Sequence, residues 1–433
     1  MKRIRPFKGS LAGLALAILL ASALPAAAAE RMVAAGADAL VRAVKTAQAG
    51  DTLRLAPGTH VGPVVLDKPL TLEGESGAII EGNGSGSVIT IEADDVSVEN
   101  LTITGSGLSN ETLDSGVKLV KGVKRAVVRD NRLLNNLVGV DVHGAIGATV
   151  SGNLIEGRRD LRMNERGNGI YVWNAPDLLA EGNTIRYGRD GIFVNTSRED
   201  TLRGNRFEKL RFAIHYMYGN DGTVEGNVSI GNDIGYALMF SQGLTIRNNT
   251  SVRDRNHGLM LNYANDAVIT GNTVREGGEK CLFMYNANKN VVHGNRFEGC
   301  PIGIHFTAGS ADNRISGNAF IGNRTQVKYV GTRDVVWSEN GRGNYWSDHS
   351  AFDTNGDGIA ESAYRPNDMV DQILWTQPAA KLLTGSPAVQ LLRWTQSQFP
   401  ALLPGGVVDT APLMHPPEET APKVSLPETG GQG

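Results

Sequence analysis

Four side chains that could hold a soft metal ion recur at a nearly constant spacing in the middle of the chain: His215, Met217, Met239 and Met260. The step from Met217 to Met239 is almost the same as the step from Met239 to Met260. If these positions fall on adjacent turns of a stacked β-structure, neighbouring side chains lie about 5 Å apart. Imidazole and thioether ligands together favour Cu(I) over Zn²⁺ or Ca²⁺. The spacing therefore suggests a Cu(I) site that spans neighbouring turns.

A second candidate metal site is a short loop rich in Asp, Asn and Gly. Asp353, Asn355, Asp357 and Glu361 occupy the first, third, fifth and ninth positions of a calcium-loop pattern, with Gly at the sixth. The twelfth position, where an EF-hand has Glu, is Tyr364. A complete EF-hand is therefore not expected, and two interpretations stay open: a structural Ca²⁺ loop, and a turn without metal.

A repeat with a period in the low twenties must position these side chains. Gly-Asn pairs recur along the chain, and from Asn183 onward the Asn residues follow one another with a period of about 22–23 residues. The step from Asn153 to Asn183 is longer, so one turn carries an extra loop around positions 158–166. This period, with strict alternation and no helical stretch, predicts an all-β right-handed parallel β-helix with turns of about 22–23 residues. Asn suits such turns because it tolerates left-handed backbone angles and can hydrogen-bond along a stack.

The only two cysteines, Cys281 and Cys300, are separated by a little less than one period of this repeat. The two thiols could therefore form a disulfide in an oxidising compartment. Cys300 nevertheless falls three positions short of the repeat position of Cys281. Three alternatives stay open at this point: a disulfide, free thiols and metal ligands.

A second column of segments, about half a period before the Asn column, predicts one outward face. With Ile170 and Val172 pointing inward, alternate residues point outward in successive turns. The predicted outward pairs are Asp141/His143, Tyr171/Trp173, Phe193/Asn195, His215/Met217, Ala237/Met239, Met260/Asn262, Phe283/Tyr285 and His305/Thr307. A solvated sheet face normally carries Lys, Glu and Thr, whereas this one is rich in aromatic, His and Met side chains.

Three interpretations of this face stay open: packing under a loop or the C-terminal segment, an aromatic platform for sugar rings, and the Cu(I) site. His143 and His305 lie several turns from His215 and are not expected to share a site with it. Catalysis is not expected. Glycoside hydrolysis needs two facing carboxylates, and the predicted face offers only Asp141.

The segments outside the repeat divide the chain further. Residues 1–29 have a basic start and an apolar stretch shorter than a membrane span, which predicts a cleaved signal peptide. Residues 30–345 form the predicted β-helix, and an amphipathic helix at 36–49 is expected to cap its first turn. Residues 346–374 contain the Asp/Asn/Gly loop, 375–415 a helical tail, and 416–433 a disordered end.

Charge limits the class of partner. The chain has 42 basic and 45 acidic residues, a net charge of −3. Cleavage after residue 29 removes four basic residues and no acidic ones, so the net charge becomes −7. The basic residues are scattered and form no stripe, which argues against nucleic-acid binding.

Several segments resemble the NosD family, periplasmic maturation factors of nitrous oxide reductase. They are 213–219 (AIHYMYG), 235–241 (GYALMFS), 258–264 (GLMLNYA), 343–348 (GNYWSD) and the tail 386–414. The tail is the most specific of these, because nothing in a β-helix requires it.

The resemblance implies a periplasmic non-enzyme that sits on the membrane subunit of an ABC transporter. It would help to assemble the copper sites of nitrous oxide reductase, together with a copper chaperone. The tail at 375–415 would be the transporter dock, through Leu391, Leu392, Trp394 and Phe399. The resemblance supplies no copper ligands, so the copper assignment above rests on residue type and spacing alone.

Two other functions stay open. One is a secreted β-helix that binds or modifies polysaccharide, in the lyase or epimerase class. The other is an adaptor that binds proteins but no copper.

Overall fold

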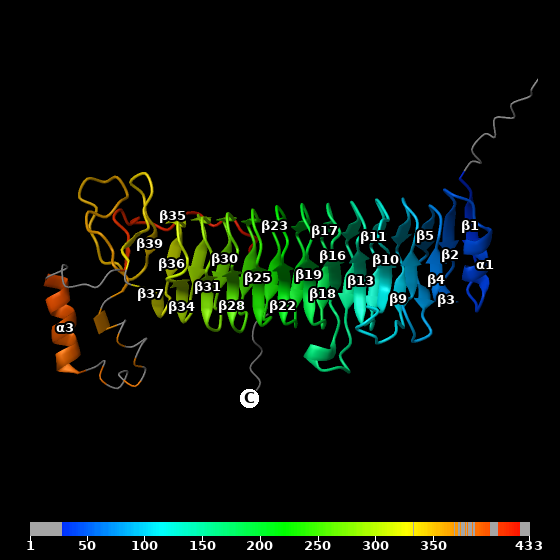
Figure 1. Cartoon of the computed structure of the whole chain (residues 1–433), viewed down its shortest axis with the longest axis horizontal. Helices are drawn as coiled ribbons and strands as arrows, with labels where there is room; N and C mark the ends of the chain where they lie inside the picture. The colour runs from blue at the N-terminus through cyan, green and yellow to red at the C-terminus, as the bar shows by residue number, and fades with distance from the viewer. Residues whose placement is uncertain are drawn as a thin grey trace, which may run out of the picture.

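The computed structural model describes residues 28–331, 333–367, 369–370, 373, 377, 379, 383, 386–398 and 406–424. Within these ranges the chain winds into a right-handed parallel β-helix (Figure 1). The expected fold class is therefore confirmed. Most of the signal segment predicted at 1–29 lies outside the described residues, as does Phe399. No helix in the described ranges is long and apolar enough to cross a membrane.

Three parallel sheets form the walls of the solenoid, because each turn contributes about one strand to each wall. Sheet A contains β1 (Glu30–Val33), β2 (Thr52–Leu55), β5 (Thr71–Gly74), β8 (Ser97–Glu99), β11 (Val127–Arg129), β14 (Thr149–Ser151), β17 (Leu179–Glu181), β20 (Thr201–Arg203), β23 (Thr223–Glu225), β26 (Thr245–Arg247), β29 (Val268–Thr270), β32 (Val291–His293) and β35 (Arg314–Ser316). Sheet B contains β3 (Gly58–Val61), β6 (Ala78–Glu81), β9 (Thr102–Thr104), β12 (Arg132–Leu134), β15 (Leu154–Glu156), β18 (Thr184–Arg186), β21 (Arg206–Glu208), β24 (Val228–Ile230), β27 (Thr250–Val252), β30 (Thr273–Arg275), β33 (Arg296–Glu298), β36 (Ala319–Ile321) and β39 (Tyr345–Trp346). Sheet C contains β4 (Val64–Leu66), β7 (Ile89–Ile91), β10 (Ser115–Leu119), β13 (Val138–His143), β16 (Ile170–Trp173), β19 (Asp190–Asn195), β22 (Phe212–Met217), β25 (Ile234–Met239), β28 (His257–Asn262), β31 (Lys280–Tyr285), β34 (Ile302–Thr307) and β37 (Thr325–Val330).

The core is a set of side-chain columns that run along the solenoid axis. Inward positions of all three sheets mostly carry Val, Ile, Leu or Phe, and most of these side chains are fully buried. Sheet C also has a Gly column directly before its inward aliphatic residue. At Gly191, a Cβ atom would lie 2.4 Å from the carbonyl oxygen of Ala213 and 2.4 Å from the Phe207 ring. Glycine is required there because the strands approach too closely for any side chain.

The Asn column forms a continuous buried ladder. In a typical step, Nδ2 of Asn227 donates to the carbonyl oxygen of Leu202 and to Oδ1 of Asn249, at 2.8 and 2.9 Å. The backbone N–H of Asn227 donates to the same Oδ1 at 3.0 Å. The predicted hydrogen-bonded stack is confirmed, but the predicted left-handed backbone belongs to the preceding residue, for example Gly226 at φ 63°. The Asn points inward and satisfies the polar groups of the corner.

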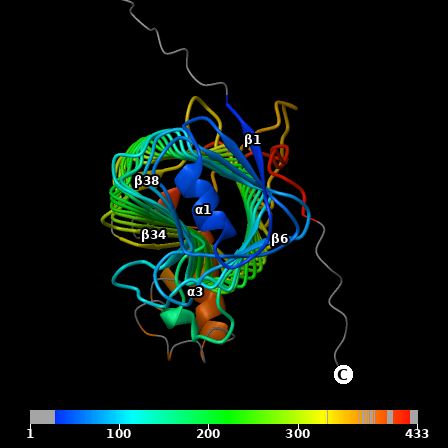
Figure 2. The same ribbon diagram turned by 90° about the vertical axis from the view of Figure 1, so that its right-hand side faces the viewer.

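A helix closes the N-terminal end of the solenoid. The predicted capping helix is α1 (Ala39–Thr46), and Leu40 and Val44 are its buried residues. It lies across the open end of the first turns (Figure 2). This placement covers core side chains that would otherwise face water. The extra loop after β15 carries a short 3₁₀ helix, η1 (Met163–Glu165).

The C-terminal end is closed by residues far apart in the sequence. Strand β38 (Val335–Val336) pairs with β40 (Val407–Val408). Asp409 is fully buried there and accepts hydrogen bonds from the backbone N–H of Asn344 and from Nε1 of Trp346, at 2.6 and 2.8 Å. The stretch 406–414, which we expected to belong to a docking tail, is therefore part of the C-terminal cap. Helix α3 (Pro387–Gln398) is the helical part of the tail.

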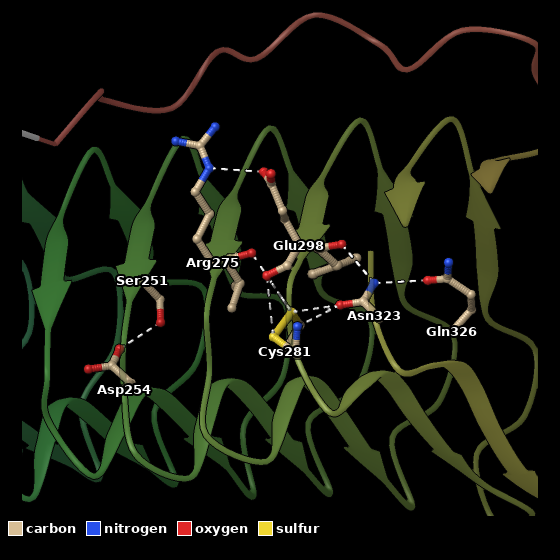
Figure 3. Close-up of a disulfide and its surroundings, with 10 residues drawn as sticks. Ser251, Asp254, Arg275, Cys281, Glu298, Asn323 and Gln326 are labelled. Carbon is tan, nitrogen blue, oxygen red and sulfur yellow. Dashed lines mark hydrogen bonds and ion pairs between the residues drawn. A yellow bond between two sulfur atoms is a disulfide. The ribbon is translucent and has the colours of Figure 1, made fainter. Parts of the chain in front are cut away.

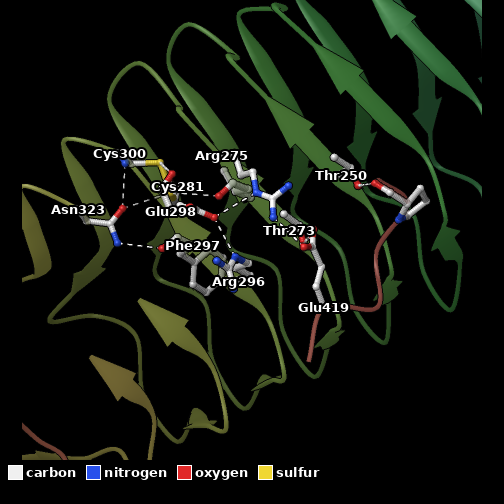
Figure 4. Close-up of polar contacts among 12 residues, drawn as sticks. Thr250, Thr273, Arg275, Cys281, Arg296, Phe297, Glu298, Cys300, Asn323 and Glu419 are labelled. Atoms are coloured by element: carbon white, nitrogen blue, oxygen red, sulfur yellow. Dashed lines mark hydrogen bonds and ion pairs between the residues drawn. A yellow bond between two sulfur atoms is a disulfide. The ribbon is translucent and has the colours of Figure 1, made fainter. Parts of the chain in front are cut away.

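Residues 419–422 contact the solenoid wall, although disorder was expected for 416–433; residues 425–433 lie outside the described residues. Glu419 forms an ion pair with Arg275 at 2.7 Å, and Thr250 donates to the carbonyl oxygen of Pro422, also at 2.7 Å (Figure 4). These contacts are with sheet B strands β27 and β30. These contacts could not be predicted from the sequence, because the segment is polar and Pro-rich and its partners are far away along the chain.

Of the three alternatives for the cysteines, the structure has the disulfide. Cys281 and Cys300 are bonded, with their Cα atoms 5.7 Å apart and both side chains buried (Figure 3). The backbone N–H of Cys300 donates to Oδ1 of Asn323 at 2.9 Å, which ties the bridge to the next turn. The three-position offset is accommodated because Cys300 lies in the corner before β34 and reaches inward to β31.

Candidate metal centre on sheet C

The outer face of sheet C carries the predicted columns in the predicted register. Phe193 pairs with His215, His215 with Ala237, and Ala237 with Met260. Beside them, Met217 pairs with Met239. All the predicted outward pairs from Asp141/His143 to His305/Thr307 follow these two columns. The strict alternation of the sequence was therefore sufficient to place them.

A third outward column was missed. It begins each strand and contains Asp190, Phe212, Ile234, His257 and Lys280. The Gly, Ala or Cys that follows each of these residues interrupts the simple alternation, so counting back in twos assigns the position incorrectly. The available signal was the polar or aromatic residue that directly precedes the Gly/Ala column.

His215 is held in a defined orientation by this missed column. Its Nδ1 lies 3.1 Å from Oδ2 of Asp190, and Arg211 binds the same carboxylate through Nε and a terminal nitrogen at 2.8 and 2.6 Å. Hydrogen bonds to His215 and Arg211 outweigh burial and lower the pKa of Asp190. The imidazole also stacks on Phe193 at 4.5 Å and meets the edge of Phe212 at 5.0 Å.

This arrangement leaves one nitrogen of His215 available. With Nδ1–H donating to Asp190, the lone pair is on Nε2, which is buried and has no hydrogen-bond partner among the described residues. A carboxylate that orients a histidine from its other nitrogen is the usual support for a histidine metal ligand. His215 is therefore suited to bind a metal through Nε2.

The methionines lie on the same outward face as this imidazole, around Ala237. Ala237 points outward between His215 and Met260, yet it is completely covered. It is covered because Met260, Met239 and the larger apolar neighbours on this face pack together over its small side chain. Met217 lies beside Met239 on the adjacent strand and is partly exposed. The predicted set thus occupies one patch, with Met260 one strand beyond Ala237.

Comparison with known proteins identifies the family of the chain that carries this patch. Residues 151–351 match a family described as "Periplasmic copper-binding protein (NosD)", and 75–185 match a right-handed β-helix region. A "Probable ABC transporter binding protein NosD" of Stutzerimonas stutzeri is 42% identical over 380 residues, covering 84% of this chain and 87% of the relative. This chain belongs to the NosD family. A Pseudomonas aeruginosa relative with the same description is 40% identical over 376 residues, covering 84% of this chain and 88% of the relative.

The solved structures show the fold alone. The A-module of the mannuronan C-5 epimerase AlgE4 of Azotobacter vinelandii superposes with a TM-score of 0.50 at 12% identity, over 65% of this chain and 88% of that chain. The NosD family is described as copper-binding, which agrees with the expectation of a non-enzyme. The two carboxylates on this face, Asp141 and Asp190, are two strands apart, and each has a basic partner of its own.

A further set of aromatic side chains lies at the corner that directly follows the sheet C strands β22, β25 and β28. Tyr218, Phe240 and Tyr263 stack on one another at 5.3 and 5.2 Å, with interplanar angles of 23° and 7°. Their ring faces therefore contact each other along the axis. A sugar ring stacks on an exposed aromatic face, so this arrangement disfavours sugar binding at the corner, while the platform on the predicted outward pairs stays a prediction. Nor does the described C-terminal segment cover the face, since residues 415–424 contact sheet B.

The carboxylates of the calcium-loop residues Asp353 and Glu361 accept hydrogen bonds from other residues of the same loop. Asp353 accepts hydrogen bonds from the N–H groups of Gly356 and Gly358 at 2.7 and 2.8 Å, and these bonds lower its pKa. Glu361 accepts from the backbone and hydroxyl of Thr354 at 2.7 and 2.6 Å. No group of three His, Cys, Asp or Glu in the described ranges is arranged to hold a metal. The geometry of Asp353, Asn355, Asp357 and Glu361 does not support the Ca²⁺ hypothesis.

The predicted docking residues lie on the helix beyond the cap. On α3, Leu391 and Trp394 are 62% and 60% exposed, and Leu392 is half-buried. The helix is at the opposite end of the molecule from α1 (Figure 1).

Proposed function

We propose that this protein is a periplasmic accessory factor for the assembly of the copper sites of nitrous oxide reductase. In this proposal it works with the membrane subunit of an ABC transporter and with a copper chaperone, and it carries Cu(I) itself. The NosD family membership supports the copper and transporter parts of this proposal. The observation that carries the direct role in copper binding is the Asp190–His215 pair. It leaves Nε2 without a hydrogen-bond partner among the described residues, on the outward face that also carries the paired Met217 and Met239.

The donor chemistry fits a carried ion. His215 supplies one nitrogen, and Met217 and Met239 supply thioethers from adjacent strands. Such ligands prefer Cu(I) to harder cations. Because thioethers are neutral and Met217 and Met239 are partly exposed, the ion would remain accessible to a partner. Met260 contributes a third sulfur if its side chain turns away from Ala237.

Contacts within sheet C hold His215 in position without a bound metal. Asp190 and His215 lie on β19 and β22, in the middle of a sheet of twelve strands. Arg211 neutralises the carboxylate and also lies 4.4 Å over the Phe212 ring. The imidazole is therefore oriented by the fold, and copper binding would not have to organise it.

Partner binding is assigned to α3. Leu391 and Trp394 give this helix an exposed apolar side, and tryptophan is enriched at the energetic centres of protein interfaces. The helix is separate from the copper patch, so docking at the transporter would leave sheet C open for exchange with a second protein.

The test is an anaerobic Cu(I) titration of the mature protein against a chromophoric chelator. Tight stoichiometric binding that is weakened by His215→Gln and by the double variant Met217→Leu/Met239→Leu supports the proposal. Binding that is unchanged in these variants would refute the site. Absence of any Cu(I) binding would leave an adaptor role with the same partners, and tight binding of an acidic polysaccharide would favour the enzyme class instead.

A further inference from the structure

A second pair of polar side chains lies on sheet C, nearer the N-terminal end of the same face. Asp141 and His143 are on β13, three strands before β22. They are two positions apart on one strand, so both side chains point outward. The proposed copper carrier role makes no use of them.

Asp141 is an unusual carboxylate, because it is completely buried on the outer face of a sheet. Oδ1 accepts no hydrogen bond from any residue in the described ranges, and the close partner of Oδ2 there is a single ammonium group. Its one cationic neighbour at close range is Lys118, whose Nζ lies 3.3 Å from Oδ2 and also donates to the carbonyl oxygen of Thr112 at 2.7 Å. A buried carboxylate normally accepts several hydrogen bonds. Oδ1 of Asp141 is therefore unusual, because it accepts none from the described residues.

Oδ1 of Asp141 lies near a second buried atom that has no hydrogen bond within the described residues. Nδ1 of His143 is buried, has no hydrogen bond within the described structure, and lies 4.0 Å from Oδ1 of Asp141. This separation is too long for a hydrogen bond. It can hold one cation, since metal bonds to imidazole nitrogen and carboxylate oxygen are about 2.0–2.2 Å. The ring is kept in place by stacking on Trp173 at 4.5 Å.

We propose that Asp141 and His143 form a second metal site, which binds a divalent cation of the Cu(II) class between Oδ1 and Nδ1. A carboxylate oxygen is a hard donor and an imidazole nitrogen a borderline one, in contrast to the soft thioethers around His215. Among first-row divalent ions such a site binds Cu(II) most tightly. The His143 side chain is 36% exposed, but its Nδ1 and both oxygens of Asp141 are buried, so the ring must shift for the ion and its water ligands to enter.

The electrostatic surroundings set the conditions for binding. Burial raises the pKa of Asp141 to about 6, and Lys118 opposes this shift. Burial, with Lys118 and Lys121, lowers the pKa of His143. Tyr171, the neighbour of Asp141 on β16, is the other titratable group that faces it, and its pKa is raised by burial and by Asp141. Lys118 competes with the cation for the carboxylate.

The test is a Cu(II) titration of the mature protein at pH 7.5 with excess glycine, which masks weak surface sites, combined with electron paramagnetic resonance. We expect Asp141→Asn and His143→Gln each to weaken Cu(II) binding at least tenfold. His143→Gln should also remove the magnetic coupling of one imidazole nitrogen. His305→Gln is the matched control, because His305 is on the same face with an unpartnered Nδ1 but has no carboxylate beside it.

A variant that should bind Cu(II) more tightly distinguishes loss of the metal site from loss of folding. Lys118→Met removes the competing cation and should tighten Cu(II) binding several-fold, which no unfolded protein would show. Unchanged Cu(II) affinity in Asp141→Asn and His143→Gln, or a weakening in Lys118→Met, would overturn the proposal. Cu(I) titrations of the same variants should match wild type, so this site and the one at His215 can fail independently.

Discussion

Oδ2 of Asp190 lies 3.1 Å from Nδ1 of His215 and 2.6 Å from a terminal nitrogen of Arg211. One carboxylate oxygen thus connects the side chain that would bind copper to the cation that neutralises the carboxylate. The two partners come from the start of β22 and from its outward face, and Asp190 comes from the turn before. The orientation of His215 therefore depends on how one turn of the solenoid stacks on the next.

Replacing Asp190 by Asn should weaken Cu(I) binding by roughly tenfold to a hundredfold, the usual effect of removing a support for a metal-binding histidine. The amide cannot accept from both Arg211 and His215 in the same geometry. The measurement is the chelator-competition titration. Met284→Leu is the control, because Met284 points into the core and is fully buried. A normal affinity in Asp190→Asn would show that the orientation of His215 does not matter for copper.

Removing the disulfide should destabilise the protein without affecting copper. The Cys281→Ala/Cys300→Ala variant opens a loop whose closure is worth about 3 kcal/mol. We expect a lower Tm in thermal denaturation followed by circular dichroism. Cu(I) affinity should be unchanged because both sulfurs face the interior. A loss of Cu(I) binding in this variant would instead point to the cysteines as ligands.

The Asn ladder should be highly sensitive to substitution. Asn227→Ala removes four side-chain hydrogen bonds and leaves the buried N–H groups of Asn205 without an acceptor. Unsatisfied buried donors cost about 1–3 kcal/mol each, so we expect a large fall in Tm or insoluble protein. Asn355→Ala, in an exposed loop, is the control and should unfold like wild type. Equal stability of the two variants would contradict a structural role for the ladder.

The contribution of Asp254 to stability should fall as the pH rises from about 4 to about 7. Asp254 is completely buried, and burial raises its pKa to about 7, although it accepts hydrogen bonds from Ser229 and Ser251 at 2.8 and 2.6 Å. Between the ordinary value near 3.8 and this raised value, the folded protein binds more protons than the unfolded chain, so raising the pH favours unfolding. Asp200, with a pKa raised to about 7, adds to the effect.

Asp254→Asn should flatten this pH profile, because an amide cannot ionise and Ser hydroxyls can rotate to accept from it. The measurement is Tm from pH 4 to pH 8, with exposed Asp67→Asn as control. We expect Asp254→Asn to gain stability relative to wild type at pH 8 and not at pH 4. A parallel shift of the whole profile would mean that Asp254 stays protonated throughout this range.

Charge placed on α3 should disrupt partner binding. In Leu391→Asp/Trp394→Asp, two exposed apolar side chains become acidic, so the fold and the Cu(I) affinity should be retained. We expect at least a tenfold loss of affinity for the transporter membrane subunit in detergent, measured by biolayer interferometry. Val65→Asp/Met32→Asp, at the other end of the solenoid, is a control with similarly exposed apolar residues. Equal binding by both variants would place the dock elsewhere.

The sequence by itself determined the solenoid and the two outward columns of sheet C. A fixed period and side-chain alternation are local properties, and once each turn stacks on the last they determine which residue of one turn lies beside which residue of the next. This is why the adjacency of Met217 and Met239, and the hydrogen-bonded Asn stack, followed from counting.

Only the tertiary structure decided the features in which periodicity breaks or distant segments meet. The Gly after Asp190 interrupts the alternation, so the carboxylate that orients His215 was hidden from a two-residue count. Asp409 is buried against Asn344 and Trp346, and Glu419 binds Arg275, although these partners are far apart along the chain. No repeat connects such residues, because their contacts depend on how the chain returns over the end of the solenoid. The burial that leaves Asp141 without a hydrogen bond likewise depends on the side chains packed over it, which spacing along one chain does not contain.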